Sequence, residues 1–376
     1  MKIVIAPNAF KGGLDAFEAA EAIKIGLEKS QLQCETILLP IADGGDGTMD
    51  VLVRHFGGEL VSCPTEDALG RPMNANFGLI DFGKTAIIEL ATASGIRHLK
   101  ASALNPMHAS TFGSGLLIRK ALEYNVNEVV ITLGGSATVD GGIGLLSALG
   151  LEISGWEEAP LGGQVLENIT SVDTDELDKL VEGVKFTLLC DVDNCLLGDE
   201  GAAAVFGPQK GATSNMVAEL ETGLSNFAEV TKSAKGIDPA QLKHGGAAGG
   251  CGAFLSAYLD AEIVDGSEYL FTKMKLDEHL LGADLVITAE GRIDEQTRHG
   301  KGPYAIAQNA KKKNVRTIAL AGQIDPGFDI SAYEAFSAVF PIGNGPATLD
   351  EAIELTLVNI TRTATQIGQL LSITGL

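Results

Sequence analysis

Two carboxylates in this sequence stand at the end of an apolar segment that predicts a buried β-strand. Asp191 and Asp193 close the segment that begins at Lys185, and strand alternation would place both side chains on the same side. Such a pair suits a metal site, or a metal ligand beside a general base. Structural ion pairing is the weaker alternative, because strand ends seldom bring two acids together without a partner.

A glycine-rich segment, Gly134–Gly144, joins a predicted buried strand to an apolar helix. This junction leaves backbone N–H groups unpaired at the helix N-terminus, where the helix dipole also favours a phosphate. Ser136 and Thr138 add hydroxyl donors, and Asp140 adds a carboxylate that suits a metal or a helix cap. The spacing matches neither a P-loop nor a dinucleotide fingerprint, so a tight structural turn is an equal alternative.

Charged residues also follow the first two predicted strands, residues 2–6 and 35–41. Lys11 stands beside glycines at a helix entrance and could hold a phosphate, although an exposed loop lysine is the simpler reading. Asp43 and Asp46 lie among glycines, where carboxylates can bind Mg²⁺ or orient a hydroxyl. A turn with a helix cap is the alternative there.

Two later loops carry cations. Lys210 lies in a rigid Gly-Pro-Gln-Lys-Gly turn, and Arg292 follows a strand predicted at residues 284–288 and precedes Gln296 and Thr297. The planar guanidinium of Arg292 could bind a carboxylate through two parallel hydrogen bonds. An ion-pair network with the neighbouring acids is the structural alternative.

These residue types together favour phosphoryl transfer, which depends on positioning, a divalent metal, cationic neutralisation and a base. The sequence contains no Gly-x-Ser-x-Gly motif, so acyl transfer through a serine nucleophile is disfavoured. The histidines lie in no recognisable catalytic context.

The net charge of the chain disfavours some classes of binding partner. The formal net charge is −22 over 376 residues, which disfavours nucleic acid and anionic membranes as partners. The five scattered cysteines fit free thiols in a reducing compartment. No signal peptide or membrane-spanning run is apparent, so we expect a cytoplasmic protein. The sequence leaves a homo-oligomer open.

Strands and helices alternate at both ends of the chain, which predicts an α/β fold with a parallel sheet. Residues 59–90 instead contain short strands separated by turns, which indicates an antiparallel patch. We therefore expect two α/β domains. One is a Rossmann-like parallel sheet built from both chain ends, residues 1–58 and 283–376, and the other is an inserted mixed-sheet domain, residues 59–282, that carries the glycine-rich segment.

Seven motifs in order, spread nearly from end to end, give the chain a close resemblance to the bacterial type I glycerate kinases. They are Ala6–Gly12, Ala42–Thr48, Gly134–Gly142, Cys190–Asn194, Phe206–Ala212, Gly245–Gly250 and Glu290–Thr297. The resemblance implies ATP-dependent phosphorylation of D-glycerate with Mg²⁺, in a cleft between two α/β domains. It also implies 2-phosphoglycerate as the product, with transfer to the 3-hydroxyl or to a related hydroxy acid as the alternative.

The sequence departs from the family pattern in its first motif, where Asn8, Ala9 and Gly13 replace polar residues. Asp46 stands where glutamate is usual, and Cys195 where proline is usual. These changes bear on individual site residues more than on the activity.

The charge types of these residues and their placement at strand ends predict individual roles in phosphoryl transfer. We expect Asp191 to accept the proton of the attacking hydroxyl, Lys11 to act on the transferred phosphoryl group, and Asp193 with Asp43 to hold Mg²⁺. Arg292 is expected to bind the glycerate carboxylate. The remaining predicted substrate- and phosphate-binding residues are Gly134, Gly135, Ser136, Ala137, Thr138, Lys210, Gln296 and Thr297.

Two other classes of function use similar loops. A nucleotide-binding oxidoreductase would need a dinucleotide fingerprint with an acid about twenty positions further on, and that pattern is absent. A non-catalytic carboxylate-binding protein would explain the loops but not the pairing of Asp191 with Asp193.

Overall fold

The computed structural model describes residues 1–156, 161–298, 302–327, 329 and 334–374. The chain forms two compact units. Unit 1 contains residues 1–43 and 267–376, and unit 2 contains residues 44–266. None of the helices in these described ranges is long and apolar enough to cross a membrane.

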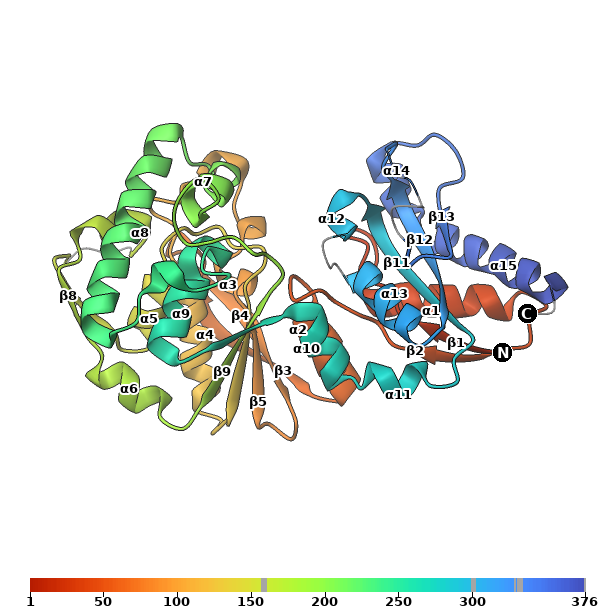
Figure 1. Cartoon of the computed structure of the whole chain (residues 1–376), viewed down its shortest axis with the longest axis horizontal. Helices are drawn as coiled ribbons and strands as arrows, with labels where there is room; N and C mark the ends of the chain where they lie inside the picture. The colour runs from red at the N-terminus through yellow and green to blue at the C-terminus, as the bar shows by residue number, and fades with distance from the viewer. Residues whose placement is uncertain (157–160, 299–301, 328, 330–333, 375–376) are drawn as a thin grey trace. The chain divides into compact units, whose positions relative to one another are not determined.

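Unit 1 is built on a parallel five-stranded sheet of order β13-β12-β11-β1-β2 (Figure 1). Its strands are β1 (Lys2–Ile5), β2 (Glu35–Leu38), β11 (Leu285–Ile293), β12 (Arg316–Ile324) and β13 (Ala338–Pro341). Its helices are α1 (Ala16–Glu28), α11 (Leu276–Leu280), α12 (Glu295–Arg298), α13 (Gly302–Lys312), α14 (Leu349–Glu354) and α15 (Thr356–Thr374), and α10 (Gly266–Lys273) begins at its boundary.

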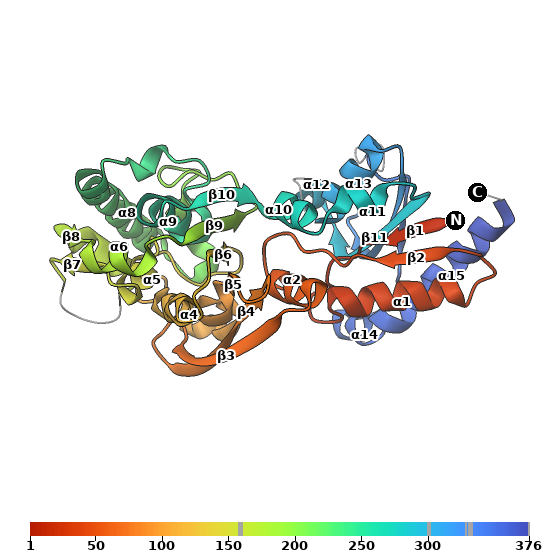
Figure 2. The ribbon, with the colours of Figure 1, turned by 90° about the horizontal axis from the view of Figure 1, so that it is seen from below.

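Helices cover both faces of the unit 1 sheet because alternate strand residues are apolar on each side. Ile3, Ile287 and Leu320 pack with α1 and α15 on one face, where the two helices run side by side (Figures 1 and 2). Ala319 and Ala321 pack with α13 on the other face. This is the doubly wound arrangement, with β1 taken from one end of the chain and β11 from the other.

Local sequence sets the start of α1. The Asp15 carboxylate accepts a hydrogen bond from the Glu18 N–H over 2.8 Å, and the Glu18 carboxylate accepts one from the Asp15 N–H over 2.9 Å. This reciprocal capping box satisfies two donors that the first helical turn would leave unpaired.

Unit 2 contains a six-stranded mixed sheet of order β10-β9-β6-β5-β4-β3. The four strands β5 (Thr85–Glu89), β6 (Glu128–Thr132), β9 (Lys185–Cys190) and β10 (Glu262–Asp265) are parallel to one another. The strand β4 (Pro72–Ile80) pairs antiparallel with β5 on one side and with β3 (Glu59–Glu66) on the other. The antiparallel patch predicted for residues 59–90 is therefore present, although β5 also joins the parallel part of the sheet through β6. A small antiparallel pair, β7 (Glu152–Ser154) with β8 (Ser171–Asp173), lies outside this sheet.

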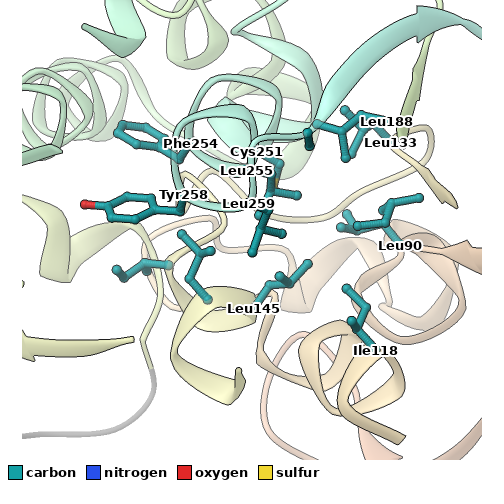
Figure 3. Close-up of a cluster of buried hydrophobic side chains, with 14 of the residues drawn as sticks. Leu90, Ile118, Leu133, Leu145, Leu188, Cys251, Phe254, Leu255, Tyr258 and Leu259 are labelled. Atoms are coloured by element: carbon teal, nitrogen blue, oxygen red, sulfur yellow. The ribbon is translucent and has the colours of Figure 1, made fainter. Parts of the chain in front are cut away.

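The helices of unit 2 lie between its parallel strands in the sequence. They are α3 (Ala91–Ser94), α4 (Phe112–Leu122), α5 (Ile143–Ala148), α6 (Asp175–Val181), α7 (Ala202–Phe206), α8 (Ser214–Lys235) and α9 (Cys251–Leu259), with α2 (Thr48–Phe56) ahead of β3. Leu145, Phe254 and Tyr258 point into the main core of this unit, together with Leu188 from β9 (Figure 3). Burying such side chains supplies most of the stability of an α/β domain.

The predicted fold class is confirmed: the protein is an α/β protein with a parallel sheet built from both chain ends and an inserted mixed sheet. One local prediction changes. The strand β11 extends to Ile293, so Glu290 and Arg292 lie within the strand instead of after it. At the C-terminus, Leu355 separates α14 from α15.

Candidate functional site

The glycine-rich turn of unit 2 leaves β6 and packs directly on the loop that precedes α2. A Cβ atom placed on Gly134 would lie 2.9 Å from the Gly45 Cα, and one placed on Gly135 would lie 3.2 Å from the Asp46 Oδ1. Gly135 also has a φ of +73°, which favours glycine. Two of the motifs found in the sequence therefore touch, and glycine is needed where they meet.

A second contact fixes the same turn from the side of α3. The Ile96 N–H donates to the Gly135 carbonyl over 2.9 Å, and the Ala137 N–H donates to the Ser94 carbonyl over 2.9 Å. Gly95 and Ser136 thus form an isolated antiparallel β-bridge, which holds the turn close to the end of β5. A phosphate-binding loop requires this kind of preorganised backbone.

Lys210 lies beneath the turn. Its ammonium group donates to the Ser136 Oγ and to the Thr138 carbonyl, each over 2.7 Å, and only 3% of the residue is exposed. Burial lowers the pKa of Lys210 to about 8 against the opposing influence of Cys251 and Asp140. In this structure the predicted phosphate-binding lysine holds the glycine-rich turn.

Asp140 caps the backbone at the end of the turn. Its fully buried carboxylate accepts hydrogen bonds from the Thr111 N–H (2.8 Å), the Thr111 hydroxyl (2.7 Å) and the Gly142 N–H (3.1 Å). Burial raises the pKa of this carboxyl while these hydrogen bonds lower it. These bonds hold the backbone ahead of α5, whose N-cap residue is Gly142, and the Gly142 N–H is therefore already paired.

One hydroxyl of the turn is free of these contacts. The Thr138 Oγ1 is buried and has no hydrogen-bond partner within the described part of the chain. Buried hydroxyls without a partner are uncommon, because leaving one unpaired costs about 1–3 kcal/mol.

Glu89 ends β5 beside this turn, and sequence reasoning did not select it. It is 3% exposed, and its Oε1 accepts a hydrogen bond from the Met49 N–H in the first turn of α2 over 2.9 Å. Burial, with help from Asp46 and Asp50, raises the pKa of Glu89 to about 7, although the Met49 hydrogen bond and Arg97 lower it.

Asp191 and Asp193 follow β9, which ends at Cys190. Strand alternation therefore does not extend to them. Asp191 is exposed, and the side chain of Asp193 is 98% exposed and lies 3.2 Å from the His244 Nδ1. The His244 Nδ1 also lies 2.9 Å from the Val192 carbonyl oxygen, so this histidine belongs to the same loop cluster, and no motif in the sequence indicated it.

In unit 1 the predicted residues gather where the sheet order reverses. The chain leaves β1 towards β2 on one side and β11 towards β12 on the other, so the ends of β1 and β11 form a topological switch point. The Asn8 N–H donates to the Ala289 carbonyl over 2.8 Å, and a Cβ placed on Gly291 would lie 3.8 Å from the Lys11 N. The exposed Lys11 therefore stands beside the β11 segment that carries Arg292.

Arg292 lies between two carboxylates. Its Nη2 donates to Asp325 Oδ2 over 3.1 Å, and its Nε lies 3.4 Å from Asp294 Oδ2. The Asp325 carboxylate also accepts from the Gly327 N–H, and these two hydrogen bonds lower the pKa of Asp325. The ion-pair network foreseen as the structural alternative is present, and half of the Arg292 side chain remains exposed.

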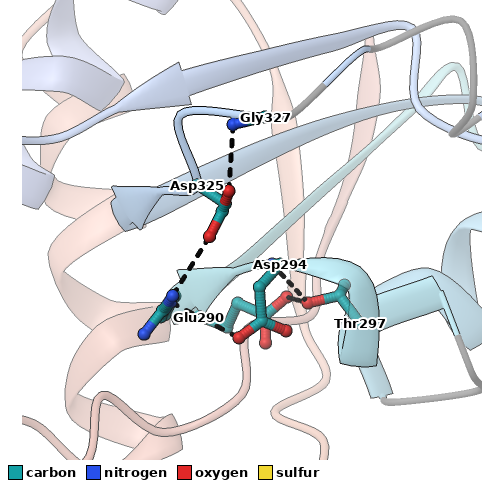
Figure 4. Close-up of polar contacts among 6 residues, drawn as sticks. Glu290, Asp294, Thr297, Asp325 and Gly327 are labelled. Atoms are coloured by element: carbon teal, nitrogen blue, oxygen red, sulfur yellow. Dashed lines mark hydrogen bonds and ion pairs between the residues drawn. The ribbon is translucent and has the colours of Figure 1, made fainter.

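Thr297 is buried and pairs with Glu290. Its hydroxyl donates to Glu290 Oε1 over 3.1 Å and accepts from the Asp294 N–H over 3.2 Å (Figure 4). The side chain of Gln296 lies outside the described part of the chain. Asp43 is the last residue of unit 1 and is partly exposed.

Some of the predicted residues thus come together within each unit. Gly134–Thr138 and Lys210 make direct contacts in unit 2, and Lys11 lies beside the strand of Arg292 in unit 1. Among the described residues no three His, Cys, Asp or Glu side chains form a ready metal site. Mg²⁺ bound with nucleotide commonly takes only one or two carboxylates beside phosphate oxygens and water, so the single exposed carboxylate of Asp193 fits that mode.

Comparisons with known proteins agree with one another. Residues 3–372 match the model of the glycerate kinase family. The chain is 41% identical to the glycerate kinase of Bacillus subtilis (strain 168), covering 98% of this chain and 97% of that protein. It is 39% identical to the glycerate 2-kinase of Escherichia coli (strain K12), covering 99% and 98%. A crystal structure described provisionally as glycerate kinase 2 from Salmonella typhimurium LT2 superposes with a TM-score of 0.88 at 38% identity, covering 100% and 99% of the two chains.

Proposed function

The chain belongs to the glycerate kinase family, and from this premise we propose that it transfers the γ-phosphoryl group of ATP to D-glycerate. The observation that carries the proposal is the match to the family model over residues 3–372. The relative named glycerate 2-kinase supports the 2-hydroxyl as acceptor and 2-phosphoglycerate as product. Transfer to the 3-hydroxyl, or to a related small hydroxy acid, is the alternative.

The glycine-rich turn is proposed to bind the ATP phosphates. Its backbone is fixed by Ser94, Ile96 and Lys210 before any ligand arrives, which lowers the entropy lost on binding. The unpaired Thr138 hydroxyl is a buried group of this motif whose hydrogen-bonding capacity is unused. Lys210 contributes through Ser136, to which its ammonium group donates.

Asp193 and Asp43 are proposed to hold Mg²⁺ together with phosphate oxygens. When bound, the ion would neutralise charge on the phosphates and orient them for in-line transfer. The Asp193 carboxylate is nearly fully exposed, and His244 lies beside it as a positioning partner.

The remaining roles concern the acceptor. Asp191 is proposed to take the proton of the attacking hydroxyl as the new O–P bond forms, while the bond between the γ-phosphorus and the β,γ-bridging oxygen breaks and ADP leaves. Arg292 is proposed to bind the glycerate carboxylate through its planar guanidinium, with Gln296 and Thr297 nearby. Lys11 is proposed to neutralise charge on the transferred phosphoryl group.

Two broader predictions accompany this function. The domain boundaries at residues 58/59 and 282/283, with the phosphate-binding turn in the inserted domain, stay a prediction. A cytoplasmic location is proposed from the five free thiols, which suit a reducing compartment.

Phosphorus NMR tests the proposal directly. Purified protein is incubated with ATP, Mg²⁺ and D-glycerate, and ADP and phosphomonoester signals are followed together. The expected result is stoichiometric ADP and a phosphomonoester whose coupling to one proton identifies the 2-phosphate, whereas coupling to a methylene group would identify the 3-phosphate. Absence of turnover by folded protein would overturn the proposal.

A further inference from the structure

Glu89 holds the loop of residues 44–48 in place against the glycine-rich turn. Its Oε1 accepts from the Met49 N–H over 2.9 Å, and this N–H belongs to the first turn of α2, where no carbonyl of the same helix can accept it. The N-cap residue of α2 is Gly47, which has no side chain to serve as a cap. A carboxyl group forty positions away therefore satisfies a donor that most helices satisfy locally.

The position of Glu89 links two motifs of the phosphate site. It ends β5, where it pairs with Thr132, two residues before Gly134 begins the turn. The loop that it reaches through Met49 contains Gly45 and Asp46, which pack against Gly134 and Gly135. One side chain thus joins the base of the turn to the loop that covers it.

The surroundings of Glu89 act on its charge in opposite directions, because burial disfavours the carboxylate whereas the Met49 N–H favours it. The charged groups that act on it are Asp46 in the loop, Asp50 in α2 and Arg97 after α3, which itself lies 3.3 Å from Asp46. When Glu89 is ionised, its carboxylate and the two neighbouring aspartates are opposed by one arginine, so the site carries excess negative charge. Burial to 3% exposure opposes ionisation further.

From this geometry we infer that Glu89 is a positioning residue for ATP binding, and that its hydrogen bond to the Met49 N–H keeps the 44–48 loop seated on the glycine-rich turn. Loss of this acceptor is expected to weaken nucleotide binding. The inference rests on the proposed function for its kinetic part only.

Three variants separate the hydrogen bond from the charge. Glu89→Gln keeps an oxygen acceptor without the charge, and Glu89→Ala removes both. Glu66→Gln is the matched control, because Glu66 is also a strand-end acid of unit 2 with a pKa raised by burial, on β3. All four proteins are assayed for kcat and for the KM for ATP at a single pH and saturating Mg²⁺.

Glu89→Ala is expected to raise the KM for ATP about fivefold over the wild type, the scale of one lost helix-cap interaction, with little change in kcat. Glu89→Gln, which keeps the oxygen acceptor, and Glu66→Gln are expected to stay near the wild-type value. A KM for ATP in Glu89→Ala equal to that of Glu66→Gln would overturn the inference.

Hydrogen exchange gives a readout that does not depend on turnover. The Met49 amide, corrected for intrinsic exchange, is expected to be protected in wild type at pH 6 and in Glu89→Gln, and to exchange faster in Glu89→Ala. Equal protection in all three proteins would overturn the inference. If the wild type binds ATP but phosphorylates no hydroxy acid, the proposed function fails while this measurement still decides the role of Glu89.

Discussion

The ammonium group of Lys210 donates to the hydroxyl of Ser136 over 2.7 Å, in a position where only 3% of the lysine is exposed. The two residues are 74 positions apart, and their contact supports the middle of the glycine-rich turn from beneath. Burying the charged group of a lysine costs free energy, so the presence of Lys210 here indicates that the structure of the turn depends on its hydrogen bonds. Substitution of Lys210 measures how far the turn depends on it.

Lys210→Met should lower both stability and nucleotide affinity. The substitution leaves the Ser136 hydroxyl and the Thr138 carbonyl without their donor, at a cost of about 1–3 kcal/mol for each buried group. We expect the free energy of unfolding to fall by ~2–4 kcal/mol and the KM for ATP to rise. Urea unfolding and initial rates provide the two measurements.

The control for this variant is Lys100→Met, which removes an exposed lysine from the same unit. It should change stability by less than about 0.5 kcal/mol. If Lys210→Met proved as stable as this control, the turn would not depend on the lysine.

Gly135→Ala should disrupt the contact between the turn and the 44–48 loop. Its φ of +73° disfavours alanine, and the added Cβ would lie 3.2 Å from the Asp46 Oδ1. Gly183→Ala is the matched control, since Gly183 has a φ of +76° but nothing within 4 Å of an added Cβ. Both variants should lose about 1 kcal/mol of stability from the backbone, but only Gly135→Ala should raise the KM for ATP. Equal KM values in the two variants would contradict the contact.

Features set by neighbouring residues were predictable from the sequence. The capping box of Asp15 and Glu18 lies within one helical turn, and the α/β alternation at both chain ends predicted the parallel sheet. The extension of β11 to Ile293 was missed because Glu290 and Arg292 are charged residues beside a glycine. Pairing with β12, out to Ile324, keeps them in the strand.

Features that depend on distant partners were not predictable. Glu89 ends an apolar segment and looks like an ordinary strand terminus, and its burial comes from the loop and helix of Asp46 and Met49. His244 reaches the Asp193 loop from a different segment about fifty residues further along. Only the folded chain brings these pairs together, and no periodicity or motif encodes them.

The stability of the wild type should fall as the pH rises from about 4.5 to 7 through the titration of Glu89. Its pKa is raised to about 7 in the folded protein from 4.5, so the folded state binds the proton more tightly in this window. This rise corresponds to ~3 kcal/mol of stability, which is lost progressively up to about pH 7, and the stability changes no further above that pH through this group. Urea unfolding of wild type and Glu89→Gln at several pH values measures the difference.

Glu89→Gln should remove this contribution, so the variant should gain stability relative to wild type as the pH rises from 5 to 8. Glu66→Gln should shift much less, because Glu66 is only partly buried. A constant difference between wild type and Glu89→Gln over the whole range would show that Glu89 is ionised throughout.

Arg292→Lys should raise the KM for glycerate by about tenfold or more and change the KM for ATP little. Asp294 and Asp325 hold the guanidinium from two sides, which fixes its plane, and lysine cannot reproduce a two-pronged contact with a carboxylate. Asp325→Asn should give a smaller increase with the same selectivity, because it loosens the arginine without removing it. Arg316→Lys is the control, since Arg316 is exposed and begins β12, at the opposite end of the strand from Asp325. Parallel increases in both KM values for Arg292→Lys would instead assign Arg292 to the general stability of the β11 end, and would remove it from the recognition of glycerate.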